Sequence, residues 1–425
     1  MKRRDLIRSA TVLTAVSYGR VLGANERIHV GIIGAGERGR ALWELFLKQP
    51  DVSPVSVCDV YEPYLEKAVA MAGSSVKRYR DFRKLLEERG ADAVIVATPD
   101  HWHALPTVEA CAMGKDVYVE KPLSLTILES RLMLNAAREH KRIVQTGSQQ
   151  RSGAHFARAV EVIQSGKLGM ISHVSSGLIR NAMPGFANKG GGGPPRGLDW
   201  DKWLGPAPYR DSLPLPPLYH FRWFWHYSGG QMTNFGAHNL DIVRWAMNVK
   251  APISVAGFGR RYALKDGGET PDVQEVIYQF PDFVLNWSVR EMNSMKAGFF
   301  LEFHGTEGNL SLSRSGFQVS SEVWPLSQEP KKLRTQEQTS EGAEQSEAHV
   351  RNFLDCIKSR VRPNADIEEG HLTAVMCHLG NIATRTGKLL RWNSEREETV
   401  GDSEANRWLH YEYRKPWRLG NGVAT

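Results

Sequence analysis

The chain has 425 residues, a formal net charge of +7 at pH 7 and 41% hydrophobic residues. This length favours two domains, because one hydrophobic core rarely serves more than about 250–300 residues. No apolar run is long enough to cross a bilayer and the basic residues form no concentrated stripe, so integral membrane proteins and nucleic-acid-binding proteins are excluded.

The first 24 residues resemble a twin-arginine export signal. Arg3 and Arg4 stand just ahead of a mildly apolar, small-residue stretch from Ser9 to Ser17, which is the order typical of such signals. We expect residues 1–24 to be a signal peptide that sends the protein through the twin-arginine export machinery to the periplasm. A basic terminus without a targeting role is the alternative, and cleavage stays open because the small-residue site near Ala24 is imperfect.

The four cysteines show no disulfide or zinc pattern. None forms a C-x-x-C pair, and all have apolar neighbours: Cys58, Cys111, Cys356 and Cys377. Free, buried thiols are therefore expected. The candidate ligand pairs His101/His103 and Glu368/His371 lack a third convergent ligand, so we expect no metal.

A glycine-rich turn follows an apolar strand that begins at Ile28. Its pattern is Gly34-x-Gly36-x-x-Gly39, in which the first glycine permits the turn, the second admits a pyrophosphate and the third lets a helix pack closely. A second apolar run ends at Asp59, where a carboxylate would bind a ribose 2′-hydroxyl and repel a 2′-phosphate. The motif predicts NAD as the cofactor; an ordinary strand-to-helix turn is the alternative.

Short apolar runs alternate with helix-like segments up to residue 147. We expect further strands at 52–57, 76–79, 93–97, 116–119 and 143–146, and helices at 61–71, 82–89, 104–113 and 125–140. This alternation predicts an α/β fold, a Rossmann doubly wound parallel sheet, over residues 25–147. Ligands in such sheets lie beyond the carboxyl ends of the strands, where Gly34, Asp59, Thr98 and Glu120 all fall.

Longer β-rich runs follow from about residue 170. Strands are expected at 171–179, 253–262, 273–280, 283–290 and 299–304, and helices at 235–247, 350–359 and 368–386. A loop rich in glycine, proline and tryptophan spans 183–228, and the polar stretch 327–346 predicts a mobile connection. We therefore expect residues 148–425 to form an α+β domain with a large, mostly antiparallel sheet, which binds substrate and mediates oligomerisation.

Two strand ends carry residues suited to a cofactor site. Pro99 stops one strand, and Lys121, within Glu120-Lys121-Pro122, is placed to donate a hydrogen bond to a substrate oxygen. A solvated surface lysine is the alternative. The predicted cofactor-binding residues are Gly34, Gly36, Arg38, Gly39, Asp59, Thr98, Pro99, His101, His103, Glu120, Lys121 and Gln149.

A third segment offers a histidine on a predicted helix. Asn234, His238 and Asp241 are spaced four and three residues apart, so on one helix they share a face. His238 could shuttle a proton between two polar neighbours, although a lone helical histidine is more often structural.

The aromatic loop supplies a hint about the substrate. The rings of Trp223, Trp225 and Tyr227 could stack on the apolar face of a sugar, whereas packing in the core or at a subunit interface is the alternative. Polar neighbours that could bind hydroxyls are His220, Arg222 and Gln231. Four glycines, Gly190 to Gly193, would let the adjoining loop move as a lid.

Taken in order, the Gly34 fingerprint, Thr98-Pro99-Asp100-His101, Glu120-Lys121-Pro122 and Gly236-x-His238-x-x-Asp241 resemble the glucose–fructose oxidoreductase, inositol dehydrogenase and rhizopine-catabolism (Gfo/Idh/MocA) family. The resemblance covers nearly the whole chain after residue 24. It implies that Lys121 and His238 are the acid/base pair, that Asp241 binds or orients substrate, that Pro122 is cis, and that the protein forms a homo-oligomer.

One position departs from the family pattern. Members that act on inositol carry an aspartate where this chain has Asn234. A neutral amide can orient His238 but cannot stabilise its protonated form as a carboxylate would. The departure therefore disfavours simple polyol oxidation as the reaction.

These features together predict an NAD-dependent oxidoreductase acting on a hydroxyl of a sugar or sugar derivative. A soluble NAD pool is not expected outside the cytoplasm, so an exported enzyme should retain and recycle its cofactor. An NAD-dependent, redox-assisted glycoside hydrolase is the first alternative, and a non-catalytic periplasmic sugar-binding protein is the second. The sugar, the hydroxyl and the second substrate stay open.

Overall fold

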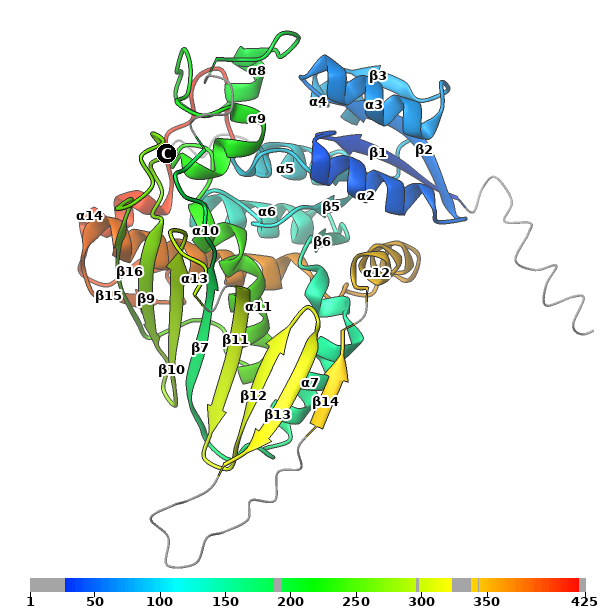
Figure 1. The fold of residues 1–425 in the computed structure, drawn as a ribbon. Coiled ribbons are helices and arrows are strands. Elements are labelled where there is room, and N and C mark those ends of the chain that lie inside the picture. The colour runs from blue at the N-terminus through cyan, green and yellow to red at the C-terminus, as the bar shows by residue number, and fades with distance from the viewer. Residues whose placement is uncertain (1–26, 187–192, 296–297, 323–337, 343, 420–425) are drawn as a thin grey trace, which may run out of the picture.

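The computed structural model describes residues 27–186, 193–295, 298–322, 338–342 and 344–419. These residues form two sheets with helices packed against them (Figure 1). The predicted signal peptide, residues 1–24, lies outside the described residues, as do Gly190 to Gly192 of the predicted lid. Within the described ranges no helix is long and apolar enough to cross a membrane.

The N-terminal sheet is parallel and has six strands in the order β3-β2-β1-β4-β5-β6. The strands are β1 Ile28–Ile33, β2 Val52–Cys58, β3 Lys77–Tyr79, β4 Ala93–Val96, β5 Asp116–Val119 and β6 Val144–Thr146. Strands β4 and β5 are buried throughout because helices cover both faces of such a sheet. The order reverses beside β1, and this switch point is where doubly wound sheets bind ligands.

Five helices connect these strands. They are α2 Glu37–Leu47, α3 Glu62–Ala72, α4 Phe82–Leu86, α5 Ala104–Ala112 and α6 Ile127–Glu139. Local chemistry sets where two of them begin: the Asp81 side chain accepts from the Arg83 N–H at the start of α4, and Thr126 and Glu129 form a capping box on α6. The predicted Rossmann-type sheet is confirmed.

The second sheet has ten strands in the order β14-β13-β12-β11-β7-β10-β9-β8-β15-β16. It is mostly antiparallel, as predicted, with β7 and β10 as a parallel pair. Its strands are β7 Ile171–Ile179, β8 Ser254–Arg260, β9 Val273–Gln279, β10 Val284–Arg290, β11 Gly298–Gly305, β12 Gly308–Ser313, β13 Gly316–Ser321, β14 Gln338–Glu341, β15 Leu390–Asn393 and β16 Glu398–Thr399.

Among the described residues, eight further α-helices follow the parallel sheet, and two of them, α12 and α13, contact the N-terminal domain. The eight are α7 Ala154–Gln164, α8 Trp200–Leu204, α9 Pro217–His220, α10 Gly230–Asn234, α11 Gly236–Met247, α12 Ser346–Ser359, α13 Ile367–Thr386 and α14 Ser403–Asn406. Helix α13 packs on β8 of the large sheet and on α6 of the N-terminal domain, and α12 packs on α2. The C-terminal part of the chain therefore contributes to the core of the N-terminal domain.

Two sequence expectations need correction. The polar stretch 327–346 is not only a connection, because Gln338–Glu341 pair with β13 as the edge strand of the large sheet; an exposed edge strand tolerates polar residues. The helix expected at 235–247 is confirmed as α11, Gly236–Met247, but Asn234 ends a separate short helix, α10, on the other side of Phe235. Asn234 and His238 therefore do not share one continuous helix.

Candidate active site

The glycine-rich turn has the geometry of a dinucleotide cradle. Gly34 adopts φ +90°, and a Cβ at this position would lie 2.7 Å from backbone atoms of Ala97 and Thr98. A Cβ at Gly39 would lie 2.1 Å from the Gly34 carbonyl oxygen, so only glycine lets α2 approach its strand. Gly36 caps α2 without a side-chain hydrogen bond, which leaves the positive end of the helix for phosphates.

Asp59 lies at the carboxyl end of β2, beside this turn. Its Oδ2 accepts from the Ala35 N–H at 2.6 Å and its Oδ1 from the Tyr61 N–H at 2.7 Å. Burial raises the pKa of Asp59 to about 6, against the effect of these hydrogen bonds. The carboxylate thus fastens the turn to the residues after β2 and lines the same cavity.

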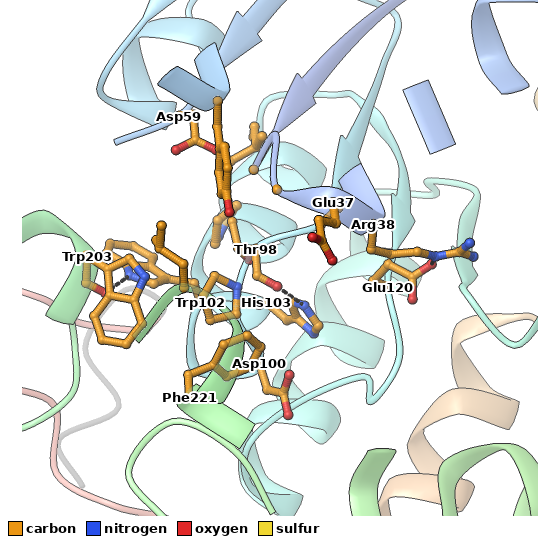
Figure 2. A pocket seen from close by; sticks show the side chains of 18 of the residues that line it. Glu37, Arg38, Asp59, Thr98, Asp100, Trp102, His103, Glu120, Trp203 and Phe221 are labelled. Atoms are coloured by element: carbon orange, nitrogen blue, oxygen red, sulfur yellow. Dashed lines mark hydrogen bonds and ion pairs between the residues drawn. The ribbon is translucent and has the colours of Figure 1, made fainter. Parts of the chain in front are cut away.

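A cavity of about 400 Å³ runs along the carboxyl ends of the parallel strands. Figure 2 shows Asp59 toward one part of it, with Arg38 and Glu120 toward another. Twelve predicted site residues line the cavity: Gly34, Gly36, Arg38, Asp59, Thr98, Pro99, His103, Glu120, Lys121, Gln149, Asn234 and His238. The structure therefore brings ten of the twelve predicted cofactor residues, all but Gly39 and His101, to one site with the predicted acid/base pair.

An ion pair and a bridging histidine shape the middle of the site. Arg38 Nε donates to Glu120 Oε1 at 2.8 Å, and this carboxylate raises the pKa of Arg38. The His103 ring lies between two carbonyl oxygens, with Nδ1 2.7 Å from that of Pro122 and Nε2 2.9 Å from that of Thr98. The Lys121–Pro122 peptide bond is cis, as the family resemblance implied.

Lys121 is held by Asn234. Its Nζ donates to the Asn234 carbonyl oxygen at 3.0 Å and to Oδ1 at 2.9 Å. The Asn234 amide donates in turn to Gln231 Oε1 at 3.1 Å, which turns Oδ1 toward the lysine. Burial lowers the pKa of Lys121 to about 8, although Glu120 opposes the shift. A lysine with this pKa exchanges protons near neutral pH.

His238 is buried beside this lysine. Burial, followed by the charge of Lys121, lowers the pKa of His238 well below its usual value. The ring is therefore a neutral imidazole, with one N–H donor and one acceptor nitrogen. The expected contact with Asn234 is absent from the hydrogen bonds of the described residues, because the Asn234 amide is engaged by Lys121 and Gln231.

Three buried polar atoms of cavity-lining residues have no hydrogen-bond partner among the described residues. They are Thr98 Oγ1, Gln149 Oε1 and His238 Nδ1. Buried polar groups in folded proteins are nearly always satisfied, so these atoms fit a polar ligand. Together with the glycine cradle, they make the site suitable for a dinucleotide and a hydroxylated substrate.

Asp241 does not reach the cavity, which corrects the prediction that it binds substrate. Arg151 Nε donates to its two carboxylate oxygens at 2.9 and 2.8 Å, and Thr373 Oγ1 donates to Oδ1 at 3.0 Å. Both members of the Arg151–Asp241 pair are buried. The side chain is therefore a structural anchor for α11.

The aromatic prediction is wrong for all three rings. Trp223 and Tyr227 are 1% and 0% exposed and belong to a hydrophobic cluster formed by the loop itself. Trp225 packs against Arg385, whose Cζ lies 4.6 Å from its ring centroid. None of the three lines the cavity, because Trp223 and Tyr227 belong to the core of the loop and Trp225 packs on Arg385.

Three further polar candidates also turn away from the cavity. His101 is fully buried with Nε2 3.0 Å from the Trp203 carbonyl oxygen, so it is not a cofactor contact. His220 accepts from Trp223 Nε1 at 3.3 Å, and Gln231 donates to Glu291 at 2.8 Å. Arg222 does line the cavity.

Several cavity-lining residues were missed by the sequence analysis. They are Trp203, Tyr219, Phe221, Arg314 and Trp417. Asp100 and Trp102, which follow Pro99 at a strand end where cofactor-lining residues are expected, also line the cavity. Arg314 carries no such signal, because it lies between β12 and β13, which were not predicted. Trp417 carries none either, because its packing on the N-terminal domain depends on the tertiary structure.

A parallel sheet with a glycine cradle and a half-buried lysine beside a buried histidine defines the class of dinucleotide-dependent oxidoreductases. Residues 28–148 match the model for the oxidoreductase family, NAD-binding Rossmann fold, and residues 187–257 and 332–419 match that for the oxidoreductase family, C-terminal alpha/beta domain. These segments make up more than half of the chain. The protein belongs to the Gfo/Idh/MocA oxidoreductase family and has its NAD-binding domain.

Curated relatives are similar over little more than a third of the chain. A glycosyl hydrolase family 109 protein of Shewanella putrefaciens is 28% identical over 163 residues, which is 36% of this chain and 35% of the relative. An alpha-N-acetylgalactosaminidase of Shewanella oneidensis is 27% identical over 172 residues, 38% of this chain and 37% of the relative. The match thus spans only about a third of the length of these relatives.

Solved structures share the fold over most of the chain. The WlbA dehydrogenase of Bordetella pertussis, in complex with NADH and UDP-GlcNAcA, has a TM-score of 0.66 at 17% identity, covering 86% of this chain and 99% of that one. A levoglucosan dehydrogenase with NADH and levoglucosan gives the same four values. An aldose-aldose oxidoreductase of Caulobacter crescentus has a TM-score of 0.66 at 18% identity, with 86% and 99% covered.

Proposed function

We propose that the protein is an NAD-dependent oxidoreductase that acts on a hydroxyl of a sugar or sugar derivative. The observation that carries this proposal is the Lys121–Asn234 contact beside His238, in the cavity that the glycine cradle also lines. It supports a role for Lys121, with its lowered pKa, as a proton acceptor beside the proposed dinucleotide site. The sugar dehydrogenases of the same fold support this class of substrate.

Lys121 is the proposed base. A neutral amine that keeps its two N–H donors on Asn234 directs its lone pair toward the remaining tetrahedral position, where a substrate hydroxyl would bind. The amine takes the hydroxyl proton during oxidation and returns it during reduction. NAD, when bound, supplies the complementary chemistry by accepting and returning a hydride.

His238 is the proposed partner of Lys121. A neutral imidazole whose Nδ1 has no partner among the described residues can exchange a hydrogen bond with the reacting hydroxyl or its neighbour. Because the ring is buried and uncharged, it orients the substrate without adding a second positive charge beside Lys121. Proton transfer is thereby assigned to the lysine and orientation to the histidine.

We infer further that the protein is exported through the twin-arginine route to the periplasm and that it retains and recycles its cofactor. The paired arginines Arg3 and Arg4 support export. The test is to purify the folded protein without added nucleotide, denature it, and identify what is released by mass spectrometry. Stoichiometric NAD or NADH supports retention, whereas an NADP-loaded protein would contradict the proposed role of Asp59.

An NAD-dependent, redox-assisted glycoside hydrolase is the second candidate. It is favoured by the similarity to the Shewanella relatives, one of which is an alpha-N-acetylgalactosaminidase. Transient oxidation of a ring hydroxyl to a ketone acidifies the adjacent C–H, and elimination then releases the aglycone and leaves a double bond. Water adds to this double bond at the carbon that lost the aglycone, and return of the hydride to the ketone restores the hydroxyl. Aglycone release from an aryl glycoside without added NAD supports this candidate; a stable oxidised sugar supports the oxidoreductase. A non-catalytic sugar-binding protein would produce neither.

A further inference from the structure

Residues 410–419, here called the C-terminal strap, return to the N-terminal domain. Tyr413, Trp417 and Leu419 pack against the hydrophobic core of the parallel sheet. Tyr413 also donates its hydroxyl to Glu129 at 2.5 Å, on α6. In Figure 1 the red end of the chain lies beside α8, a helix of the aromatic loop. The strap therefore touches both the N-terminal domain and the loop that faces it.

Arg414 fixes the strap to the aromatic loop by four hydrogen bonds. Its N–H donates to the Pro206 carbonyl oxygen at 2.9 Å and its Nε to that of Gly205 at 3.0 Å. Its Nη1 and Nη2 donate to Oδ1 and the carbonyl oxygen of Asp201 at 2.6 and 2.9 Å. These contacts hold the segment in one place along the rim of the cavity.

Trp417 reaches the cavity itself. Its ring meets that of Trp102 edge to face at 4.8 Å between centroids, and the Arg83 guanidinium lies 4.5 Å from its ring centroid. Trp102 in turn contacts Phe82 at 5.7 Å and donates its Nε1–H to the Trp203 carbonyl oxygen at 2.9 Å. Phe82, Trp102 and Trp417 all line the cavity, as does Trp203.

This aromatic group lies in the nucleotide half of the site. Phe82 begins α4 directly after β3, which pairs with β2, and β2 leads into Asp59. Asp59 is the expected contact of the adenosine ribose, so the base beyond that ribose would lie among apolar, flat side chains. Such surroundings suit a purine ring, which stacks on aromatic side chains.

We propose that Trp417 is a cofactor-binding residue that covers the adenine of NAD, and that the C-terminal strap sets the rate at which the cofactor leaves. This inference rests on the proposed function. Release would require Trp417 to move off the base and the Arg414 contacts to open. In this proposal the strap accounts for retention of NAD, whether or not the protein is exported.

The test measures NAD release rather than turnover. Protein loaded with labelled NAD is diluted into excess unlabelled NAD, and the label that remains bound to the protein is followed with time. We expect Trp417→Ala to release NAD at least tenfold faster than the unaltered protein, Trp417→Phe to stay within about threefold, and Arg414→Ala to fall between them. Trp408→Ala is the matched control, because this tryptophan is 41% exposed and lies outside the cavity.

The outcomes separate the inference from the proposed function. If Trp417→Ala binds NAD and releases it at the rate of the unaltered protein, the role of the strap is overturned and the proposed oxidoreductase function still stands. Failure of the unaltered protein to bind added NAD overturns both. If Trp417→Ala does not fold, Arg414→Ala decides, because its side chain does not line the cavity; an unchanged release rate in this variant counts against the strap.

Discussion

Asn234 holds Lys121 through two acceptors, its backbone oxygen at 3.0 Å and its side-chain Oδ1 at 2.9 Å from Nζ. The departure from the family's aspartate therefore acts on the lysine and not, as the sequence suggested, on His238. An amide accepts hydrogen bonds from the amine without a full negative charge, so it stabilises the ammonium form less than a carboxylate would. This difference permits the low pKa of Lys121.

The first prediction concerns pH. Lys121 must be neutral to accept a proton, so kcat/KM for sugar oxidation should rise as pH increases through about 8. Asn234→Asp adds a charge that favours the ammonium form, and the rise should move to higher pH by roughly one pH unit or more. Rate measurements from pH 6 to 10 check this. Superimposable profiles for the two proteins would contradict the assignment of Lys121 as the base.

The second prediction separates an enzyme from a sugar-binding protein. Lys121→Ala and His238→Ala should each lower turnover by roughly 10²–10⁴, because each removes a group proposed to touch the reacting hydroxyl. The quantity of NAD bound per chain, measured by mass spectrometry after denaturation, should stay near that of the unaltered protein. Unchanged turnover in both variants would contradict the proposed catalytic roles of Lys121 and His238.

The third prediction concerns Asp241. Replacing it by Ala leaves the Arg151 guanidinium buried without its main partner, and we expect a loss of about 3–5 kcal/mol of unfolding free energy. The sugar KM of the folded variant should not change, because Asp241 does not line the cavity. Denaturant unfolding and steady-state kinetics measure the two quantities. A raised KM at unchanged stability would restore the substrate-binding role that the family resemblance implied.

The fourth prediction locates the sugar. Tyr219 lines the cavity and is 50% exposed, so its ring is available where Trp223 is not. Tyr219→Ala should raise the sugar KM roughly two- to tenfold, because this change corresponds to the binding free energy of one aromatic contact. Tyr262→Ala is the control, because Tyr262 is similarly exposed, at 55%, and lies away from the cavity. Equal effects of the two substitutions would rule out a specific contact at Tyr219.

The parallel sheet could be predicted well because its signals are local. The central strands β1, β4 and β5 are short, largely apolar runs that are mostly buried, and Gly34 and Gly39 are required by atoms that lie close in the sequence or one strand away. The cofactor residues follow from the same rule, since they stand at strand ends. The edge strand β14 gave no such signal, because its exposure removes the apolar pattern.

The substrate half of the site was harder to predict. Composition shows that the loop after β7 is aromatic, but which rings face the cavity depends on how the loop packs on itself, and Trp223 and Tyr227 pack inward. Asp241 was predicted to be a site residue because its ion-pair partner, Arg151, lies 90 residues away in the sequence and could not be inferred from spacing. Such pairings depend on the tertiary arrangement and leave no trace in local spacing.

The packing of α12 on α2 has a consequence for how the protein folds. Arg351 donates to both oxygens of Asp51, and the Phe353 ring contacts Phe46 and Tyr118. The N-terminal domain is synthesised first, but its core is complete only when α12 has been made, some 200 residues after β6, the last strand of that domain. Its apolar surface stays uncovered in the meantime, so a nascent or truncated chain is the form of this protein most in need of a chaperone.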